Sequence, residues 1–150
     1  MSIQSSSHET LLASVDRDAP RVLMIDDDPD ITWFVKVALA YDNVIVLRDH
    51  DGQRGSLDAL QESPDLILTD LDMPRRNGHE VIHFVRSHPD LKHLPIVVVT
   101  SSKEPGIKER VLSEGANGFV SKPIDIPTLK RELGRWLPKR GEADSMNRKP

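Results

Sequence analysis

The amino-acid sequence predicts an α/β fold, namely an open, doubly wound parallel sheet of five strands with five helices. Five short apolar runs alternate along the chain with segments of helical periodicity, and short connections join them, as in repeated strand–helix units. The apolar runs are continuous and do not alternate with polar residues. Continuous runs are typical of parallel strands that helices cover on both faces.

The predicted strands are the apolar runs at residues 22–25, 44–47, 66–68, 96–99 and 119–120. A helix is expected after each of them. Asp28 stands directly before Pro29, so we interpret it as the cap of the first helix and not as a metal ligand. Similar patterns open three later helices, with Asn77 and Glu80 at one start, Ser101 and Glu104 at the next, and Asp125 at the last.

The helical segments carry apolar residues at spacings that place them on one face. The second helix is the weakest, because Leu57 and Leu60 alone mark it. In the first helix the expected apolar stripe consists of Ile31, Phe34, Val35, Ala38 and Leu39. The corresponding residues of the later helices are Val81, Phe84 and Val85, then Val111 and Leu112, then Ile126, Leu129, Leu133 and Trp136.

Length and composition exclude several classes of protein. The 150 residues suffice for one full domain. With 20 Lys plus Arg against 24 Asp plus Glu, the formal charge of -4 gives no reason to expect nucleic acid or an anionic membrane as the main partner. The N-terminus lacks a signal-peptide pattern, and no window approaches the roughly 20 apolar residues that span a bilayer. The absence of cysteine excludes disulfides and thiolate zinc sites, so we expect a cytoplasmic protein.

Polar residues follow the predicted strands where each strand ends. Asp26 and Asp27 follow the first strand, Asp70 the third, Thr100 the fourth and Lys122 the fifth. Carboxyl ends of parallel strands form the ligand site in such sheets, so we expect these side chains to gather at one edge. Gathered carboxylates repel each other unless a divalent cation lies among them, and ligation by oxygen alone suits Mg²⁺. A carboxylate nucleophile, Mg²⁺, a lysine and a hydroxyl together predict an aspartate that becomes phosphorylated.

At these residues the chain resembles the receiver domain of two-component response regulators. The matching segments are "MIDDDPD", "PDLILTDLDMPRRNG", "PIVVVTSS" and "GANGFVSKP", in the order and at the strand ends that the family requires. The resemblance runs from about Arg21 to Leu137. We therefore place a receiver domain at residues 20–138, between tails at 1–19 and 139–150. The resemblance implies the flavodoxin-like strand order 2-1-3-4-5.

The resemblance also implies a role for each residue of the predicted site. Asp26 and Asp27 correspond to the acidic pair that binds Mg²⁺, and Asp70 corresponds to the phosphoacceptor. Lys122 corresponds to the characteristic lysine of the family. The remaining correspondences are Thr100 for the switch hydroxyl, Phe119 for the switch aromatic residue, and the backbone carbonyl of Asp72 for a further metal ligand. The acidic side chain of Asp72 would add charge beside the phosphate.

The function implied by the resemblance is that of a phosphoacceptor, not of an enzyme with a separate substrate. A histidine kinase or a histidine phosphotransfer protein would phosphorylate Asp70, and the phosphorylated chain would bind a downstream protein or a second copy of itself. Only twelve residues follow Pro138, too few for a helix-turn-helix module. We therefore expect a receiver that acts alone and does not contact nucleic acid or a membrane.

Two other functions stay open at this point. A degenerate receiver would act as an interaction module without phosphorylation. In addition, Asp70-Leu71-Asp72 resembles the nucleophile motif of haloacid-dehalogenase-type phosphatases, although Met73-Pro74 does not match that motif.

Three further stretches have ordinary interpretations. His79 and His83 lie four residues apart, but without a third ligand nearby in the sequence we interpret them as a solvated helix face. The apolar residues Leu11, Leu12 and Val15 allow either a docking helix or a loose tail. The stretch "LRDHDGQRGS" after the second strand matches the family poorly, which leaves the bounds of the second helix open.

Overall fold

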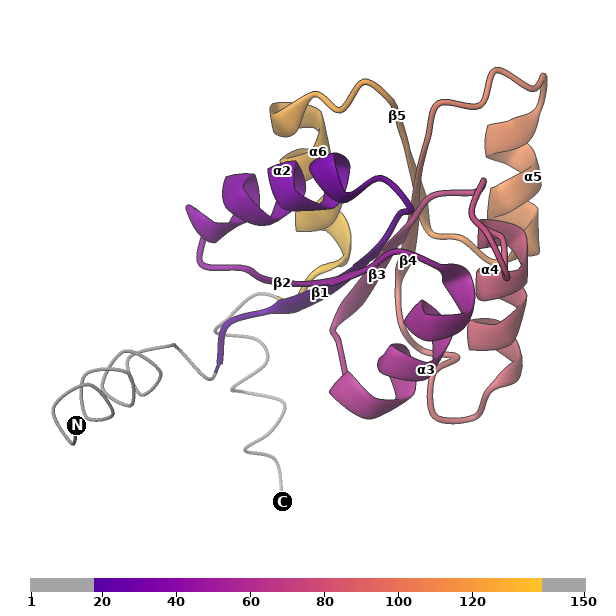
Figure 1. The fold of residues 1–150 in the computed structure, drawn as a ribbon, viewed down its shortest axis with the longest axis horizontal. Coiled ribbons are helices and arrows are strands. Elements are labelled where there is room, and N and C mark those ends of the chain that lie inside the picture. The colour runs from indigo at the N-terminus through magenta and orange to yellow at the C-terminus, as the bar shows by residue number, and fades with distance from the viewer. Residues whose placement is uncertain (1–17, 139–150) are drawn as a thin grey trace, which may run out of the picture.

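The computed structural model describes residues 18–138, which form the predicted five-stranded parallel sheet in the order β2-β1-β3-β4-β5 (Figure 1). The strands are β1 (Arg21–Ile25), β2 (Ile45–Asp49), β3 (Leu66–Thr69), β4 (Ile96–Thr100) and β5 (Gly118–Ser121). The helices are α2 (Pro29–Ala40), α3 (Gly52–Glu62), α4 (Gly78–Ser87), α5 (Ile107–Glu114) and α6 (Ile126–Trp136). The fold class and the strand order are therefore confirmed.

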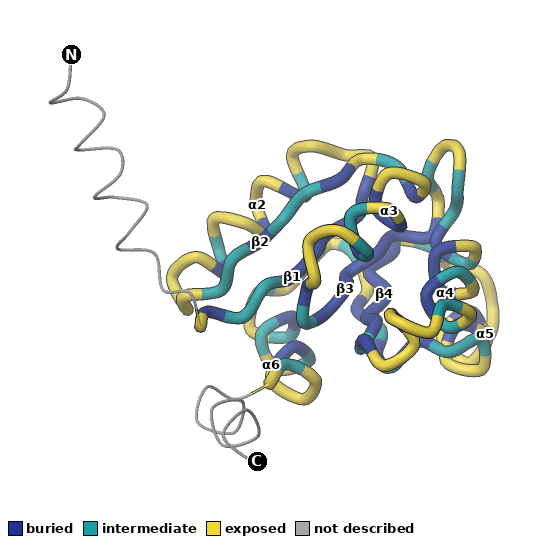
Figure 2. Tube along the Cα trace, turned by 90° about the horizontal axis from the view of Figure 1, so that it is seen from below, coloured by how far each residue is buried: buried dark blue, intermediate teal, exposed yellow. Residues whose placement is uncertain are grey.

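Helices cover both faces of the sheet and enclose two apolar layers. One layer lies under α2 and α6, where Met24 and Leu68 pack against Val35 and Leu129. The other layer lies under α3, α4 and α5 and includes Val98 of β4. Figure 2 shows the central strands as buried, whereas the edge strand β2 is only partly buried. The continuous apolar runs of the sequence thus belong to strands that are buried on both faces, as predicted.

Three of the predicted helix caps are confirmed. The Asp28 carboxylate accepts a hydrogen bond from the Asp30 N–H at 2.9 Å, which supports its interpretation as a cap. Asn77 and Glu80 form a reciprocal capping box at the start of α4, and Asp125 caps α6. The N-terminus of α3 is capped by Asp51, which accepts from the Arg54 N–H at 2.7 Å.

The predicted start of α5 at Ser101 and Glu104 is wrong. The Ser102 hydroxyl accepts from the Glu104 N–H in a local turn, and the helix begins only at Ile107. Pro105 disfavours helical backbone at the preceding residue. Gly106 then takes the left-handed conformation with φ 78°, so the chain turns before it enters the helix.

The predicted apolar stripes were partly wrong. Phe34, Leu57, Leu112 and Trp136 are exposed, and Phe34 shows 47% of its surface. In α2 the buried face consists of Thr32, Val35 and Leu39. Thr32 tolerates complete burial because its hydroxyl accepts from Arg48 Nε at 3.0 Å and donates to the Pro29 carbonyl at 3.1 Å.

The N-terminal apolar residues and the capacity to span a membrane remain to be compared with the fold. Leu11, Leu12 and Val15 lie outside the described residues. Within residues 18–138, no helix has the length and apolar character needed to cross a membrane.

Candidate functional site

The carboxyl ends of β1 and β3 place Asp26 and Asp70 next to each other. The two strands pair in parallel with Ile25 opposite Thr69, and the Asp70 N–H donates to the Ile25 carbonyl at 2.9 Å. Asp26 has no exposed surface and Asp70 has 7%. Two buried carboxylates side by side require a positive partner, because burial strongly disfavours an unpaired charge.

Lys122 supplies that partner from the loop after β5. Its Nζ donates to Asp26 Oδ2 at 2.6 Å and to Asp70 Oδ2 at 3.0 Å. The second oxygen of each carboxylate accepts from backbone, Asp26 Oδ1 from the Asp28 N–H and Asp70 Oδ1 from the Leu71 N–H. The Lys122 ammonium therefore bridges the ends of three strands. The peptide bond between Lys122 and Pro123 is cis.

Burial and charge act in opposite directions on these groups. Burial raises the pKa of Asp26 above its ordinary value, even though the Lys122 ammonium and the Asp28 N–H favour the charged form. Burial also works against the ammonium of Lys122, but its hydrogen bonds to Asp26 and Asp70 and their charges outweigh this effect and raise its pKa. The site has more negative charge than one ammonium neutralises.

The acidic residues can hold a divalent cation. Asp26, Asp27 and Asp70 each offer a carboxylate oxygen, and these oxygens lie within 4.8 Å of one another. Among residues 18–138, no other group of three or more His, Asp or Glu side chains lies close enough together to bind one metal ion. A donor set made only of oxygen fits Mg²⁺ better than a transition metal.

Comparisons with known proteins agree with this geometry. Residues 22–133 match the family model described as the response regulator receiver domain. The chain belongs to this family.

Individual relatives show how widely the receiver domain is used. KdpE, the KDP operon transcriptional regulatory protein of Escherichia coli, is 34% identical over 112 residues, which cover 75% of this chain and 48% of KdpE. Sensor histidine kinase TmoS of Ectopseudomonas mendocina is 28% identical over 131 residues, which cover 87% of this chain and 13% of the kinase. The chain thus spans half or less of the length of these two relatives.

Solved structures show the same fold. Chemotaxis protein CheY4 of Vibrio cholerae has a TM-score of 0.74 at 30% identity, and the match covers 79% of this chain and 99% of CheY4. The receiver domain of a sensor histidine kinase from Pseudomonas aeruginosa has a TM-score of 0.72 at 25% identity, covering 79% of this chain and 97% of that domain. That structure has a magnesium ion coordinated in its active-site cleft.

The two predicted switch residues of this receiver point to the same face of the sheet. Thr100 is buried at the end of β4, and its hydroxyl oxygen accepts from the Ser102 N–H at 3.2 Å. Phe119 of β5 pairs with Val98, two residues before Thr100, and packs partly buried on the layer under α3, α4 and α5. Because side chains alternate along a strand, Thr100 lies on the Phe119 side of the sheet.

Asp72 lies exposed in the loop that follows β3. Its side chain does not belong to the group of three clustered carboxylates. The predicted role of Asp72 does not require this, because that role uses the backbone carbonyl. The carbonyl as a metal ligand stays a prediction.

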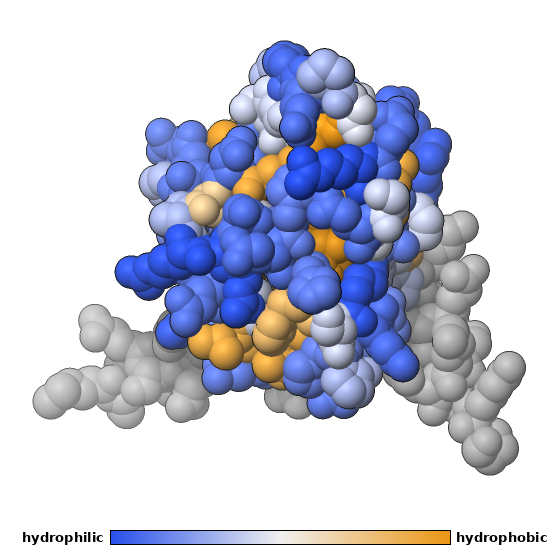
Figure 3. All heavy atoms as spheres, turned by 90° about the vertical axis from the view of Figure 1, so that its right-hand side faces the viewer, coloured by the Kyte–Doolittle hydropathy of each residue, from blue (hydrophilic) through white to orange (hydrophobic). Residues whose placement is uncertain are grey.

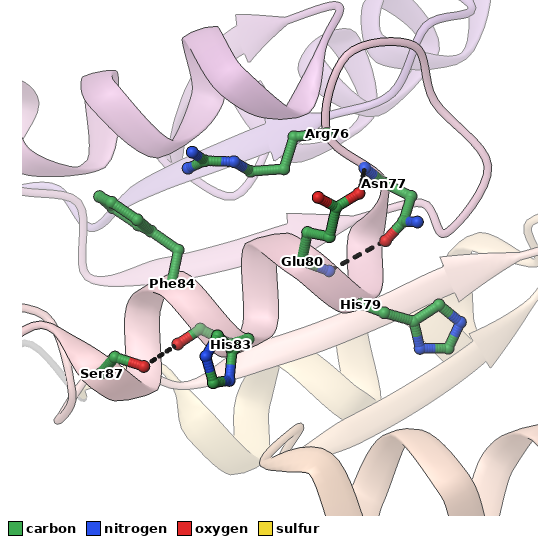
Figure 4. Close-up of a pocket in the computed structure, with 7 residues that line it drawn as sticks. All are labelled: Arg76, Asn77, His79, Glu80, His83, Phe84 and Ser87. Atoms are coloured by element: carbon green, nitrogen blue, oxygen red, sulfur yellow. Dashed lines mark hydrogen bonds between the residues drawn. The ribbon is translucent and has the colours of Figure 1, made fainter.

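The prediction of a solvated helix face is confirmed for His83, which is exposed, but wrong for His79 of α4. The His79 side chain is 23% exposed, and its Nδ1 lies 2.7 Å from Glu114 Oε1, a contact that links α4 to α5. Figure 4 shows His79 and His83 along the same shallow hollow of α4 as Arg76 and Phe84. Neither histidine belongs to a cluster of three metal ligands within residues 18–138.

Figure 3 shows that the side of the molecule with α4 and α5 is mainly hydrophilic, with separate apolar areas.

A buried carboxyl at the end of β2, that of Asp49, was not predicted from the sequence. Asp49 is 8% exposed, and within residues 18–138 its Oδ2 has no hydrogen-bond partner. Burial, together with the hydrogen bond and charge of Asp58, raises the pKa of Asp49 to about 7. The available signal was its position one residue beyond the apolar run at 44–47, with Arg48 between them, just as Thr69 stands between the third run and Asp70.

Asp49 should make the stability of this receiver depend on pH. Its pKa is higher in the folded than in the unfolded chain, where an ordinary carboxyl titrates near 4, so the folded state holds the extra proton between about pH 4 and 7. The free energy of unfolding should therefore fall, by on the order of 2 kcal/mol, as the pH rises through this window. Urea unfolding at pH 5 and pH 8 without Mg²⁺ measures the change.

The Asp49→Asn variant should lose most of this dependence, while Asp90→Asn at an exposed position should keep it. An equal pH dependence in the parent and in Asp49→Asn would assign the effect to other groups.

Proposed function

We propose that Asp70 accepts a phosphoryl group from a histidine kinase or a histidine phosphotransfer protein, and that the chain signals through phosphorylation-dependent binding to another protein. The observation that carries this proposal is the Lys122 ammonium held against Asp70 and Asp26 at 3.0 and 2.6 Å. A fixed cation beside a buried carboxylate at the mouth of an acidic cluster suits a site where an anion must be received.

Each residue of the site has a part in the transfer. A carboxylate oxygen of Asp70 would form the new O–P bond while the N–P bond of the donor phosphohistidine breaks, and the imidazole leaves with the electron pair of that bond. Asp26, Asp27, Asp70 and the Asp72 carbonyl would hold Mg²⁺, which neutralises phosphoryl charge when bound. Lys122 would turn from the carboxylate pair toward the phosphoryl oxygens. The chain is then a phosphoacceptor that assists its own phosphorylation, and not an enzyme with a separate substrate.

Mass spectrometry tests this proposal directly. Incubation with acetyl phosphate and Mg²⁺ should add one phosphoryl group to the peptide that contains Asp70, and chelation of Mg²⁺ should prevent the addition. A chain that stays unmodified under conditions that phosphorylate an established receiver would instead favour the interaction module without phosphorylation.

The surface of α2 is suited to contact the protein donor. Trp33, Phe34, Val37 and Tyr41 are all exposed, and Tyr41 shows 86% of its surface. The helix begins at Pro29, directly after the acidic residues of the site. An exposed apolar stripe that starts beside Asp28 and the acidic site suits contact with the donor, because such stripes mark protein contacts.

Phe34→Asp should slow phosphorylation by a histidine-containing donor protein by about tenfold or more, because a central apolar contact commonly contributes over 1.4 kcal/mol. Phosphorylation by acetyl phosphate should not change, since the small donor needs no docking surface. Leu57→Asp is a matched control, because Leu57 of α3 is also 47% exposed. Equal effects of Phe34→Asp with both donors would refute a docking role for α2.

The output of the receiver should appear on the surface of α5, β5 and α6, at residues 103–137. Phosphorylated Asp70 would attract the hydroxyl of Thr100, and Phe119 would fill the space that this movement leaves beside β5. The changed surface would then bind a downstream protein or a second copy. That the chain acts alone in this way stays a prediction.

Thr100→Ala should weaken this response by removing the hydroxyl, while phosphorylation of Asp70 continues. Amide signals of residues 103–137, recorded with and without beryllofluoride and Mg²⁺, measure the response. Changes confined to α3 and α4 in the parent chain would contradict the proposed route.

A further inference from the structure

The N-terminus of α3 lies in direct backbone contact with the loop that follows the phosphoacceptor. A Cβ atom added at Gly52 would lie 1.9 Å from the carbonyl oxygen of Arg76 and 2.7 Å from its carbonyl carbon. Backbone atoms cannot rotate away as a side chain can. Glycine at residue 52 is therefore required by this close approach, which explains a residue in the stretch that matches the family poorly.

A second contact joins the same two segments. Asp51 caps α3 through the Arg54 N–H at 2.7 Å, and its other oxygen, Oδ2, lies 3.5 Å from Arg75 Nη1. Arg75 is in the left-handed region with φ 68°. The Arg76 guanidinium stacks over the ring of Phe84 at 4.8 Å, so the loop is held between α3 and α4 (Figure 4).

The other end of the loop contacts the phosphoacceptor itself. A Cβ atom added at Gly78 would lie 2.1 Å from the carbonyl oxygen of Asp70. The Gly78 N–H donates to the Leu71 carbonyl at 2.9 Å, and the Leu71 N–H donates to Asp70 Oδ1 at 2.7 Å. Arg76 lies two residues before Gly78, which contacts Asp70 closely. A displacement of Arg76 would therefore be passed on to Asp70 through Gly78.

We propose that Asp51 and Gly52 position the loop of residues 70–77 and thereby the Asp70 carboxylate and the carbonyl of Asp72. The inference rests on the proposed function only where Mg²⁺ binding is used as a measurement. Asp51 and Gly52 act through the loop and are positioning residues, since neither belongs to the acidic cluster of the site.

Gly52→Ala separates positioning from general packing. Alanine favours helix over glycine, so the helix itself should not suffer, and the effect comes from the contact with Arg76. Gly55→Ala is the matched control in the same helix, because its added Cβ would meet the side chain of Ile25, 2.4 Å from Cδ1, and not the loop. Gly134→Ala adds a methyl group to α6 with no atom within 4 Å.

Hydrogen exchange of the Leu71 and Gly78 amides in the metal-free protein tests the inference without relying on phosphorylation. In Gly52→Ala these two amides should exchange about tenfold faster or more, relative to amides of the central strands. In Gly55→Ala and Gly134→Ala they should follow the global stability. Calorimetric titration should show Mg²⁺ affinity about tenfold lower in Gly52→Ala, as for residues that orient the ligands of metal sites, and nearly unchanged in Gly134→Ala.

The outcomes separate this inference from the proposed function. If the parent chain fails to bind Mg²⁺ while Gly52→Ala still loosens Leu71 and Gly78, the proposed function fails and the positioning role stands. If these amides exchange in Gly52→Ala no faster than its loss of global stability explains, the positioning role is refuted. Should Gly52→Ala not fold, Asp51→Asn decides, because asparagine keeps the cap and loses the charge that faces Arg75; unchanged exchange at Leu71 in that variant would also overturn the inference.

Discussion

Replacing Asp70 with asparagine should abolish phosphorylation of this chain by acetyl phosphate. The amide is a poor nucleophile, and it removes one of the three carboxylates that would hold Mg²⁺. No modification should be detectable. Within residues 18–138, Asp26 is the other acidic residue at a strand end that contacts Lys122, and its two oxygens are fully buried and hydrogen-bonded. Intact-protein mass spectrometry measures the result.

Asp72→Asn is the matched control for this experiment. It removes a carboxylate from the same loop but leaves the Asp72 carbonyl and Asp70 in place, so the variant should still be phosphorylated. The Asp70→Asn chain should be folded and at least as stable as the parent without Mg²⁺, because the Asp70 charge opposes ionisation of Asp26. Modification that persists in Asp70→Asn would move the phosphoacceptor to another residue.

Replacing Lys122 with methionine should have the second largest effect. Methionine matches the unbranched lysine side chain as far as its Cε but lacks the ammonium that bridges Asp26 and Asp70. Phosphorylation by acetyl phosphate should slow by on the order of 100-fold, as when a preorganised donor to a developing charge is lost. The phosphorylated variant should also fail to change the surface at residues 103–137.

The stability of Lys122→Met should fall as well. Two buried carboxylates lose their cation, which commonly costs about 3 kcal/mol when one partner of a buried pair is removed. The loss should be larger at pH 8 than at pH 5, because burial raises the pKa of Asp26 and its carboxyl gives up its charge more readily as the pH falls.

Lys130→Met provides the comparison with a surface ion pair. Lys130 Nζ lies 2.8 Å from Asp42 Oδ2, but both side chains are more than one-third exposed, so its loss should cost less than about 1 kcal/mol. Equal stability losses in the two variants, or an unchanged rate of phosphorylation in Lys122→Met, would show that Lys122 has no special role in this site.

The strands and the residues at their ends could be predicted from the sequence, because both depend on local patterns. Continuous apolar runs identify parallel strands wherever helices cover both faces, and β1, β3 and β4 are such strands. Parallel strands bring their carboxyl ends to one edge, so the residues directly after these runs had to gather there. Asp26, Asp70 and Lys122 therefore meet although 96 residues separate the first from the last.

The face of each helix that packs on the sheet was decided by tertiary structure. Apolar residues lie on two sides of α2, so its sequence allows either Phe34 or Thr32 to face the core. Thr32 is buried because Arg48 of the neighbouring strand β2 reaches its hydroxyl, a partner that helical periodicity cannot reveal. The exposed stripe of α2 follows from the same choice.

The approach of segments that are distant in the sequence was also decided only by tertiary structure. The buried Asp49 depends on how closely Asp58 packs against it, and the loop after Asp70 depends on the approach of Gly52 to the Arg76 carbonyl. The sequence by itself determined the order of strands and helices, the identity of the acidic cluster and its lysine. Distances between packed backbones depend on the packing of all elements at near-crystalline density. They set the burial of each charge and the position of the loop that follows Asp70.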